Sequence, residues 1–238
     1  MALAKYVAAA LVLLGCNCGN GGETVDAMRF PDIDNGSCGD QLRLTGEYVD
    51  WDFDASFCGI NAAVWEEDGD GGMDSTAPNG RFDFCISRAT TMTRVNITQP
   101  TAMSQCTTPP STYTVPAIAF VNHDVVLAGG FYSARAFTEA RQATLFQAVG
   151  ATFDPTKAQV FVHVDGTPRA VSLGAAHGAA QAVTATAWTA GTTGHEVFFP
   201  NVDVGSGMTA LTVAGGAIGT GDIPLVAGTI TNVTVLAN

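Results

Sequence analysis

The stretch STAPNGRFDFCI, residues 75–86, decides how the first half of the chain folds. Its dipeptide Asn79-Gly80 is a typical tight-turn signal. After the turn, apolar and polar residues alternate, which predicts a strand with one buried face. The side chains that this alternation places in a core are those of Phe82, Phe84 and Ile86.

Similar short segments occur along the rest of the chain, separated by turn residues. The sequence contains 27 glycines and many Thr and Val residues. This composition is typical of all-β domains. Alternation predicts further strands in residues 41–50, 60–65, 93–97, 160–164, 171–173, 211–213 and 233–235. We expect the strand that contains Val160, Val162 and Val164 to be half-buried, and the last strand to close the sheet.

One part of the first half resembles a known family. The segments GEYVDW, CGINAAVWEE and STAPNGRFDF resemble the carboxypeptidase regulatory-like domain, a seven-stranded, Ig-like β-sandwich of the transthyretin (prealbumin) type. The chain departs from the family pattern at the acidic insert 66–74. The second half resembles the same family more briefly, at Phe198, Asn201-Val202 and Gly205. In the first half the matching positions are Gly46, Val49, Asp50, Gly59, Ala62, Val64, Thr76, Asn79, Gly80 and Phe82.

The resemblance implies two tandem β-sandwiches, residues 41–122 and 151–238. The linker, residues 123–150, contains the one segment with helical periodicity, Ser133–Gly150, which we expect Ser133 to cap. An alternative is one larger sandwich that uses all the strands, since single all-β domains of this length exist.

The N-terminus has the features of an export signal. Residues 1–15 contain Lys5 and then an apolar run that is too short to span a bilayer. The run ends in Leu13-Leu14-Gly15-Cys16, which resembles the lipobox of bacterial lipoproteins. That resemblance implies lipidation of Cys16 and a membrane anchor; the alternative is an ordinary signal peptide followed by a chance cysteine.

The residues after Cys16 suggest where the anchored protein resides. Asn17 follows the cysteine, and by the same resemblance the absence of Asp there implies the outer membrane, facing the periplasm or the surface. Residues 16–40 are rich in Gly, Asn and Asp and lack periodicity. This composition predicts a flexible tether.

The net charge and the cysteine content restrict the partners and the covalent links that this protein can have. The formal net charge is −12, which disfavours a nucleic-acid partner. The last four of the six cysteines form an even set, and in an oxidising compartment they predict two disulfides. Three pairings are open, of which we favour Cys58–Cys85 with Cys38–Cys106. A metal site with four thiolates is disfavoured because these cysteines contain no Cys-x-x-Cys pair.

An acidic segment, residues 66–74, contains the candidate metal ligands. Calcium takes six to eight oxygen ligands, and Asp68, Asp70 and Asp74 are spaced to share one ion. The segment departs from the EF-hand pattern, because Gly72 stands at the third ligand position. The alternative is a solvated acidic turn. No other cofactor is expected.

Trp65 lies on a predicted strand beside this turn and is the best candidate for stacking against a glycan. The alternative for Trp65 is a place in the core.

No catalytic constellation is recognisable. The four histidines do not form a His-Glu-x-x-His motif, and Gly205-Ser206-Gly207 does not extend to a Gly-x-Ser-x-Gly elbow. We interpret each histidine as a strand-surface or loop residue. The sequence thus predicts a non-enzymatic, membrane-anchored lipoprotein of the envelope or surface with a structural, adhesive or protein-binding role. The alternative is a carbohydrate-binding accessory module, and a hydrolase ranks last.

Overall fold

The computed structural model describes residues 38–50, 62–67, 73–75, 80–103, 110–136, 138–183 and 188–237, and it gives the backbone alone at residues 63, 65 and 73–75. These residues all belong to one compact unit, Asn35–Asn238. The described part of the unit consists mainly of strands, as predicted, and contains two helices.

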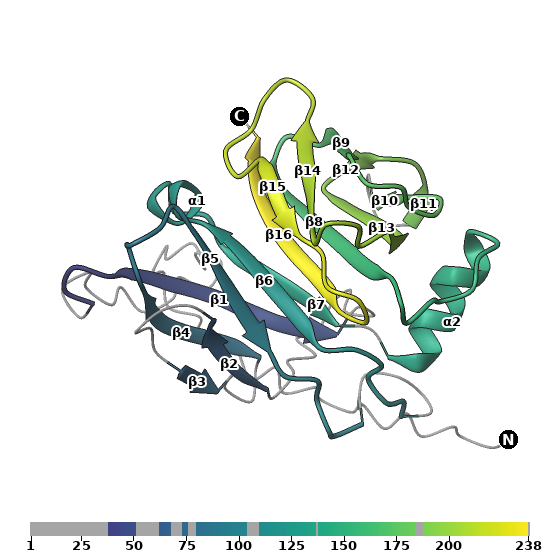
Figure 1. The fold of residues 1–238 in the computed structure, drawn as a ribbon, viewed down its shortest axis with the longest axis horizontal. Coiled ribbons are helices and arrows are strands. Elements are labelled where there is room, and N and C mark those ends of the chain that lie inside the picture. The colour runs from purple at the N-terminus through teal and green to yellow at the C-terminus, as the bar shows by residue number, and fades with distance from the viewer. Residues whose placement is uncertain are drawn as a thin grey trace, which may run out of the picture. The chain divides into compact units, whose positions relative to one another are not determined.

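A nine-stranded sheet crosses the whole unit (Figure 1). Strands from the first half of the chain form one side of the sheet, and strands from the second half form the other. In sheet order the strands are β11 (Trp188–Ala190), β10 (Gln181–Val183), β13 (Glu196–Val202), β8 (Ala158–Gly166), β16 (Ile230–Ala237), β6 (Ala117–Asn122), β5 (Met92–Ile97), β2 (Ala63–Glu66) and β3 (Met73–Ser75).

The C-terminal strand β16 lies in the centre of this sheet and runs parallel to both of its neighbours, β6 and β8. We expected this strand to close the sheet, which is wrong. Both of its faces are covered, and of its eight residues only Leu236 is more than slightly exposed. A strand buried on both faces belongs inside a sheet, because an edge would leave its backbone groups unpaired.

Two smaller sheets complete the fold. One has the order β4-β1-β7 and the other β12-β9-β14-β15. β1 pairs antiparallel with β4 and parallel with β7. The bounds are β1 (Leu42–Asp50), β4 (Arg81–Ile86), β7 (Tyr132–Ala136), β9 (Arg169–Leu173), β12 (Thr193–Gly194), β14 (Met208–Val213) and β15 (Gly221–Pro224).

The two small sheets cover opposite faces of the large sheet and form two cores. Neighbouring residues in a strand face opposite sides, so β8 contributes Phe161 to the first core and Val160 and Val162 to the second. The first core lies between β4-β1-β7 and the strands β2, β5 and β6. The second lies between β9-β14-β15 and the strands β8, β13 and β16. The half-buried strand that we predicted at Val160–Val164 is therefore covered on both faces along most of its length.

Residues 81–86 form the predicted strand, β4, but the predicted hairpin is not found, because β4 pairs with β1 whereas β3 pairs with β2 in the large sheet. Gly80 has a φ of 79°, a left-handed conformation that favours glycine. In β4, Phe82, Phe84 and Ile86 are buried in the first core, as the alternation predicted. Opposite Phe82 stands Gly46, where a Cβ atom would collide with the phenylalanine ring.

The predicted helix begins later than expected. Ser133 does not cap a helix but lies in β7, where it is paired with Glu47 of β1. The helix α2 spans Glu139–Ala148, and its cap is Thr138, whose hydroxyl accepts a hydrogen bond from the backbone N–H of Arg141. A second short helix, α1 (His123–Leu127), was not predicted. Parallel pairing with β1 decides the conformation of residues 132–136, and helical periodicity cannot reveal such a distant contact.

The tandem arrangement of two separate sandwiches is not confirmed. β16 comes from the second half of the chain and is hydrogen-bonded to β6 from the first half. We call this junction between β16 and β6 the seam between the two halves of the chain. The side-chain amide of Asn232 in β16 adds contacts across it. Its Oδ1 accepts from the backbone N–H of Arg135 at 2.8 Å, and its Nδ2 donates to the carbonyl of Ile118 at 3.3 Å.

The favoured disulfide pairing is wrong. Cys38 is bonded to Cys85, with 5.5 Å between their Cα atoms. Cys38 lies just before β1, and Cys85 lies opposite Arg43 of the same strand. Antiparallel pairing of β1 and β4 therefore brings these two cysteines together across 47 residues of sequence. Cys58 and Cys106 lie outside the described residues.

Candidate functional site

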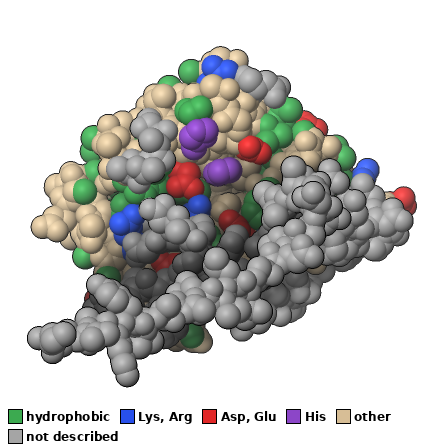
Figure 2. All heavy atoms as spheres, turned by 180° about the vertical axis from the view of Figure 1, so that it is seen from behind, with side chains coloured by type: hydrophobic (Ala, Val, Ile, Leu, Met, Phe, Trp, Pro, Cys, Tyr) green, Lys and Arg blue, Asp and Glu red, His purple; other side chains and the backbone are tan. Residues whose placement is uncertain are grey.

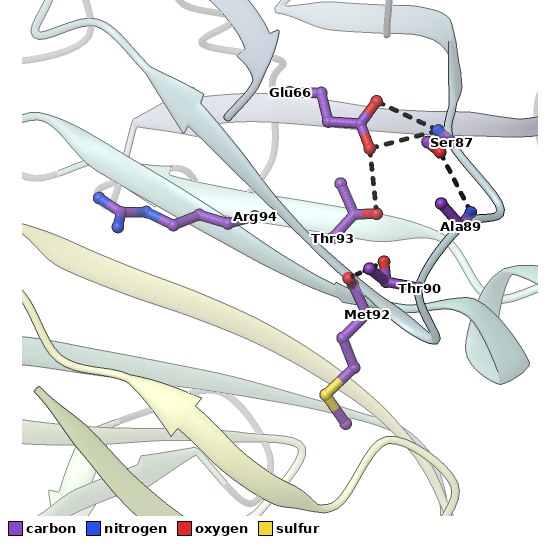
Figure 3. Close-up of a pocket in the computed structure, with 7 residues that line it drawn as sticks. All are labelled: Glu66, Ser87, Ala89, Thr90, Met92, Thr93 and Arg94. Atoms are coloured by element: carbon purple, nitrogen blue, oxygen red, sulfur yellow. Dashed lines mark hydrogen bonds between the residues drawn. The ribbon is translucent and has the colours of Figure 1, made fainter. Parts of the chain in front are cut away.

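A small pocket lies where β2 meets the turn between β4 and β5 (Figure 3). Its volume is about 70 Å³. The carboxylate of Glu66 accepts from the backbone N–H of Ser87 at 3.1 Å and 3.2 Å through its two oxygens. Thr93 Oγ1 lies 3.4 Å from the same carboxylate. Glu66 was predicted in a solvated acidic turn, but it is buried because it bonds the β4–β5 turn.

Thr93 also contacts an imidazole. Its hydroxyl lies 2.8 Å from Nε2 of His123, the first residue of α1. Burial lowers the pKa of His123, while the carboxylate of Glu66 and the carbonyl of Thr90 act in the opposite direction. The ring is therefore neutral at neutral pH, and the tautomer of the ring sets which partner donates in its hydrogen bond with Thr93. Our interpretation of His123 as a surface or loop residue is wrong, since it is buried and its ring is hydrogen-bonded to Thr93 of β5.

A hydroxyl, an imidazole and a carboxylate are the components of a nucleophilic triad, but their arrangement here does not suit one. In a triad the carboxylate orients the imidazole, whereas Glu66 lies against the hydroxyl of Thr93. The side chains are also closed off, since Thr93 is 4% and His123 6% exposed. The pocket has room for a few water molecules and not for a substrate. The contacts hold the β4–β5 turn against β2 and α1.

A second polar cluster lies on the large sheet at the end of β7. Arg135 and Glu196 form an ion pair of 2.8 Å, and both are largely buried. The guanidinium also lies 5.9 Å from the centre of the Phe161 ring. His163 stands opposite Glu196 in the ladder, and its buried Nδ1 has no hydrogen-bond partner among the described residues.

Burial lowers the pKa of His163, and the nearby Arg135 adds to this effect while Glu196 opposes it. His163 is thus half-buried and neutral rather than a simple surface residue. Figure 2 shows two histidines side by side on one face of the molecule, with acidic side chains next to them. The nearby His195 also lowers the pKa of His163 electrostatically. Arg135 neutralises Glu196, and the cluster fixes β7 to β8 and β13.

A shallow groove of about 340 Å³ lies on the large sheet at the ends of β5 and β6. It is on the face opposite the first core. Asn96 and Ile118 are direct ladder partners there. Next to them, Glu67 pairs with Arg94 and accepts from Nδ2 of Asn96 at 3.3 Å. The remaining lining comes from the segments that flank the strands, at Thr98, Gln99, Pro116 and Thr229.

The residues predicted as metal ligands are not brought together in the described part. Asp68 and Asp70 lie outside it, and Asp74 is described by its backbone alone, in the edge strand β3. Among the residues that the structure describes, no three His, Cys, Asp or Glu side chains are placed to hold a metal ion.

The anchor and stacking residues are likewise only partly placed. Cys16 lies outside the described residues. Trp65 is described by its backbone alone and occupies the ladder position opposite Asn96. No helix in the described ranges is long and apolar enough to cross a membrane.

Sequence reasoning missed the Glu66–Thr93–His123 contacts and the Arg135–Glu196 pair. Each joins strands that are distant in sequence, and neither has a local motif. The only available signal was the position of Thr93 and His163 on otherwise apolar, alternating strands.

No family model matches the chain, and no curated protein matches it. A mutant of the shaft pilin spaA from Lactobacillus rhamnosus GG aligns with 83% of this chain and 98% of its own, at 6% identity and a TM-score of 0.28. The unmutated spaA pilin aligns over the same shares at 7% identity and a TM-score of 0.26. The Bacillus anthracis TIE protein aligns with 83% of this chain and 34% of its own, at 10% identity and a TM-score of 0.26. TM-scores this low carry no argument about fold or function.

Proposed function

We propose that this chain is a non-enzymatic lipoprotein of the bacterial envelope or cell surface with a structural, adhesive or protein-binding role. The observation that carries the proposal is the closed Glu66–Thr93–His123 cluster, where a hydroxyl meets an imidazole in a space too small for a substrate. The Cys38–Cys85 disulfide supports an oxidising, exported environment. The lipobox-like segment that ends at Cys16 supports attachment to a membrane, for which we propose the outer membrane.

The anchor is tested by metabolic labelling of expressing bacteria with radioactive palmitate. The wild-type chain is expected to incorporate label and to fractionate with membranes. Cys16→Ala is expected to lose both properties, because the acylated side chain is absent. The matched control is Cys18→Ala, two residues away, which is expected to keep the label. Equal labelling of wild type and Cys16→Ala, or none in either, would contradict the anchor.

A second function, carbohydrate binding, is favoured by one specific observation. The groove on β5 and β6 is lined mainly by apolar surface, with Ile118 and Pro116 among its lining residues. Trp65 occupies a neighbouring ladder position. A glycan array probed with the mature chain tests this function. Binding that weakens in Trp65→Ala would support it, and an array without hits would contradict it.

Calcium dependence of that binding remains a separate proposal for Asp68, Asp70 and Asp74. A rise in melting temperature with millimolar calcium, absent in Asp70→Asn, is the expected result. No change in melting temperature and no heat of binding by titration calorimetry would contradict calcium binding.

A further inference from the structure

Two apolar loops without charged residues are exposed at one end of the fold. The first, VVLAGGF at residues 125–131, contains the last three residues of α1 and the turn that follows. The second, VAGGAIG at residues 213–219, begins with the last residue of β14. Each loop exposes a large apolar side chain, since Leu127 is 64% and Ile218 36% exposed. A single exposed apolar side chain is ordinary, but two such loops that meet mark a binding surface.

The two apolar loops meet beside the end of β16. Val125 of α1 packs so closely against Gly219 that a Cβ atom at the glycine would lie 2.9 Å from Cγ2 of the valine. Ile218 exchanges two backbone hydrogen bonds with Leu236 of β16, of 2.9 Å and 3.0 Å. α1 itself contacts β16. The exposed residues of both loops therefore lie at the same end of the fold.

The charged groups around the apolar loops do not favour an anionic partner. Asp124 comes directly before the first loop and Asp222 comes shortly after the second, and both are exposed. The guanidinium of Arg169 lies close to Gly215 and is the cation that the second loop contacts. The whole chain carries a net charge of −12. A surface without net charge, which offers apolar groups to the loops, suits this end of the fold better than an anionic one.

The N-terminal part of the chain joins the fold at this same end. α1 leads into β7, and β7 runs parallel to β1. The start of β1 therefore lies on the side where α1 stands, and the two elements contact each other (Figure 1). Cys38, the first described residue, comes just before β1. A tether that precedes Cys38 thus enters the fold at the end that carries the apolar loops.

We propose that the apolar loops dip into the surface of a membrane of zwitterionic lipids, the membrane to which Cys16 anchors the chain; this inference rests on the lipoprotein function proposed above. Zwitterionic headgroups carry no net charge, and the acyl chains beneath them take up the side chains of Leu127 and Ile218. Twenty-one residues separate Cys16 from Cys38, and a flexible chain of that length spans roughly 25 Å. The anchor keeps the loops close to the membrane, so a weak apolar contact suffices.

A second copy of this chain is a poorer partner for the apolar loops. A stable interface uses roughly 20–30 residues on each side. The two loops have seven residues each, and five of the fourteen are glycines without a side chain. A two-fold contact would also bring the exposed carboxylates of Asp124 and Asp222 toward those of the partner. A fluid lipid surface needs neither a large area nor a complementary shape.

The test is photolabelling of the mature chain, residues 17–238, on phosphatidylcholine vesicles. An N-terminal hexahistidine tag and a nickel-chelating lipid hold the chain there, so the test does not depend on acylation of Cys16. A phosphatidylcholine with a photoreactive group in its acyl chain is activated, and mass spectrometry locates the label. The two apolar loops are expected to carry at least fivefold more label than the segment around Met103, which is 47% exposed and lies outside them.

Variants connect this label to the exposed side chains. The double variant Leu127→Gln, Ile218→Gln is expected to lose at least fivefold of the label in both loops, because its polar side chains stay in water. Leu127→Gln alone is the second variant, should the double variant alter the fold. The matched control is Met103→Gln, which removes an equally exposed apolar side chain elsewhere and is expected to label as the wild type does.

The contrary outcomes separate the membrane contact from the anchor. Label spread evenly over the surface, or equal label in wild type and Leu127→Gln, would overturn the contact and leave the anchor standing. Stronger label on vesicles of anionic phosphatidylglycerol would overturn the preference for a neutral surface. A dimer in sedimentation that Leu127→Gln dissociates would overturn the proposal in favour of a second copy. Absence of palmitate from the wild-type chain would contradict the anchor alone, because the tagged chain is labelled without it.

Discussion

The two cores of the molecule are built differently. The first contains large rings, and the disulfide between Cys38 and Cys85 links the start of β1 to β4 outside the hydrophobic cluster itself. The second consists mainly of Val and Ala, with Leu211 and Phe199 among its few larger side chains. The large side chains that are fully buried in the first core include Tyr48, Tyr132 and Phe82.

The two cores also differ in the polar side chains that are buried beside them. Two carboxyl groups and an imidazole are buried beside the first core, those of Asp50, Glu66 and His123. The fully buried polar residues of the second half are uncharged, for example Gln159 and Thr209, although Glu196 is largely buried in its ion pair with Arg135. The stability of the second core thus comes mainly from close packing of apolar side chains on strands that are fixed by their backbone ladders. The first depends also on specific polar contacts and a covalent link, which hold short strands and long connections in place.

The largest expected effect is that of removing a ring from the first core. Phe82 is 1% exposed, and Phe82→Ala should lower the free energy of unfolding by about 3–5 kcal/mol because it leaves a cavity. Urea denaturation followed by circular dichroism measures the change. Met208→Ala, at a residue that is 45% exposed, is the control and should change stability by less than about 0.5 kcal/mol. Similar stability of both variants would mean that the first core is not packed as described.

Removal of the disulfide is expected to have the next largest effect. The double variant Cys38→Ala, Cys85→Ala should lose about 2–4 kcal/mol, because the unfolded chain gains freedom over the 47-residue loop. Hydrogen exchange should accelerate first in β1 and β4 and least in β9 and β14. Uniform acceleration in both halves would show that the cores do not differ in the way proposed.

The seam between the halves is tested by Asn232. Its amide bonds the backbone of Arg135 and Ile118, so Asn232→Leu leaves a buried N–H and a buried carbonyl without these partners. We expect a loss of about 1–3 kcal/mol. Thr231→Val, at the adjacent buried position, serves as the control; its hydroxyl donates to the carbonyl of Pro224, and a smaller loss is expected. An equal or larger loss of unfolding free energy in the control would show that Asn232 does not stabilise the seam specifically.

The smallest effect concerns pH. Burial lowers the pKa of His123 beside the first core and of His163 in β8. Because the unfolded chain then binds protons more readily, stability is complete above the ordinary histidine pKa of about 6.5 and falls as the pH drops below it. Each histidine contributes at most about 1.4 kcal/mol per pH unit.

Denaturation curves between about pH 7.5 and about pH 5 measure this dependence. His163→Gln should flatten it, because the buried ring is then absent. A slope that is the same in wild type and His163→Gln would contradict the assigned burial of the ring.

The fold was predictable from sequence where one strand face is buried. Phe82, Phe84 and Ile86 alternate with polar residues, and the alternation alone identified β4 and its core face. The same reasoning failed for β8 and β16, because both of their faces are covered and the contacts of Phe161 and Asn232 come from distant strands. Ser133 was misassigned for a similar reason, since only its pairing with β1 reveals a strand.

The candidate site was less predictable than the fold. Glu66 appeared in a run of acidic residues, where solvation is the ordinary expectation. Its burial depends on the backbone N–H of Ser87, which comes close only after β2 and β4 are both in place. The disulfide depended on register in the same way. Arg43 stands opposite Cys85, and no spacing rule in the sequence states that pairing.

The measurement that tests the account most directly is the state of Cys38 and Cys85 in the living cell. Expressing bacteria are quenched with acid, free thiols are alkylated, and the peptides are analysed by mass spectrometry without reduction. An exported β-protein with the register described should give a peptide pair that joins Cys38 to Cys85. Alkylated thiols at both positions, or Cys85 joined to Cys58, would contradict the account.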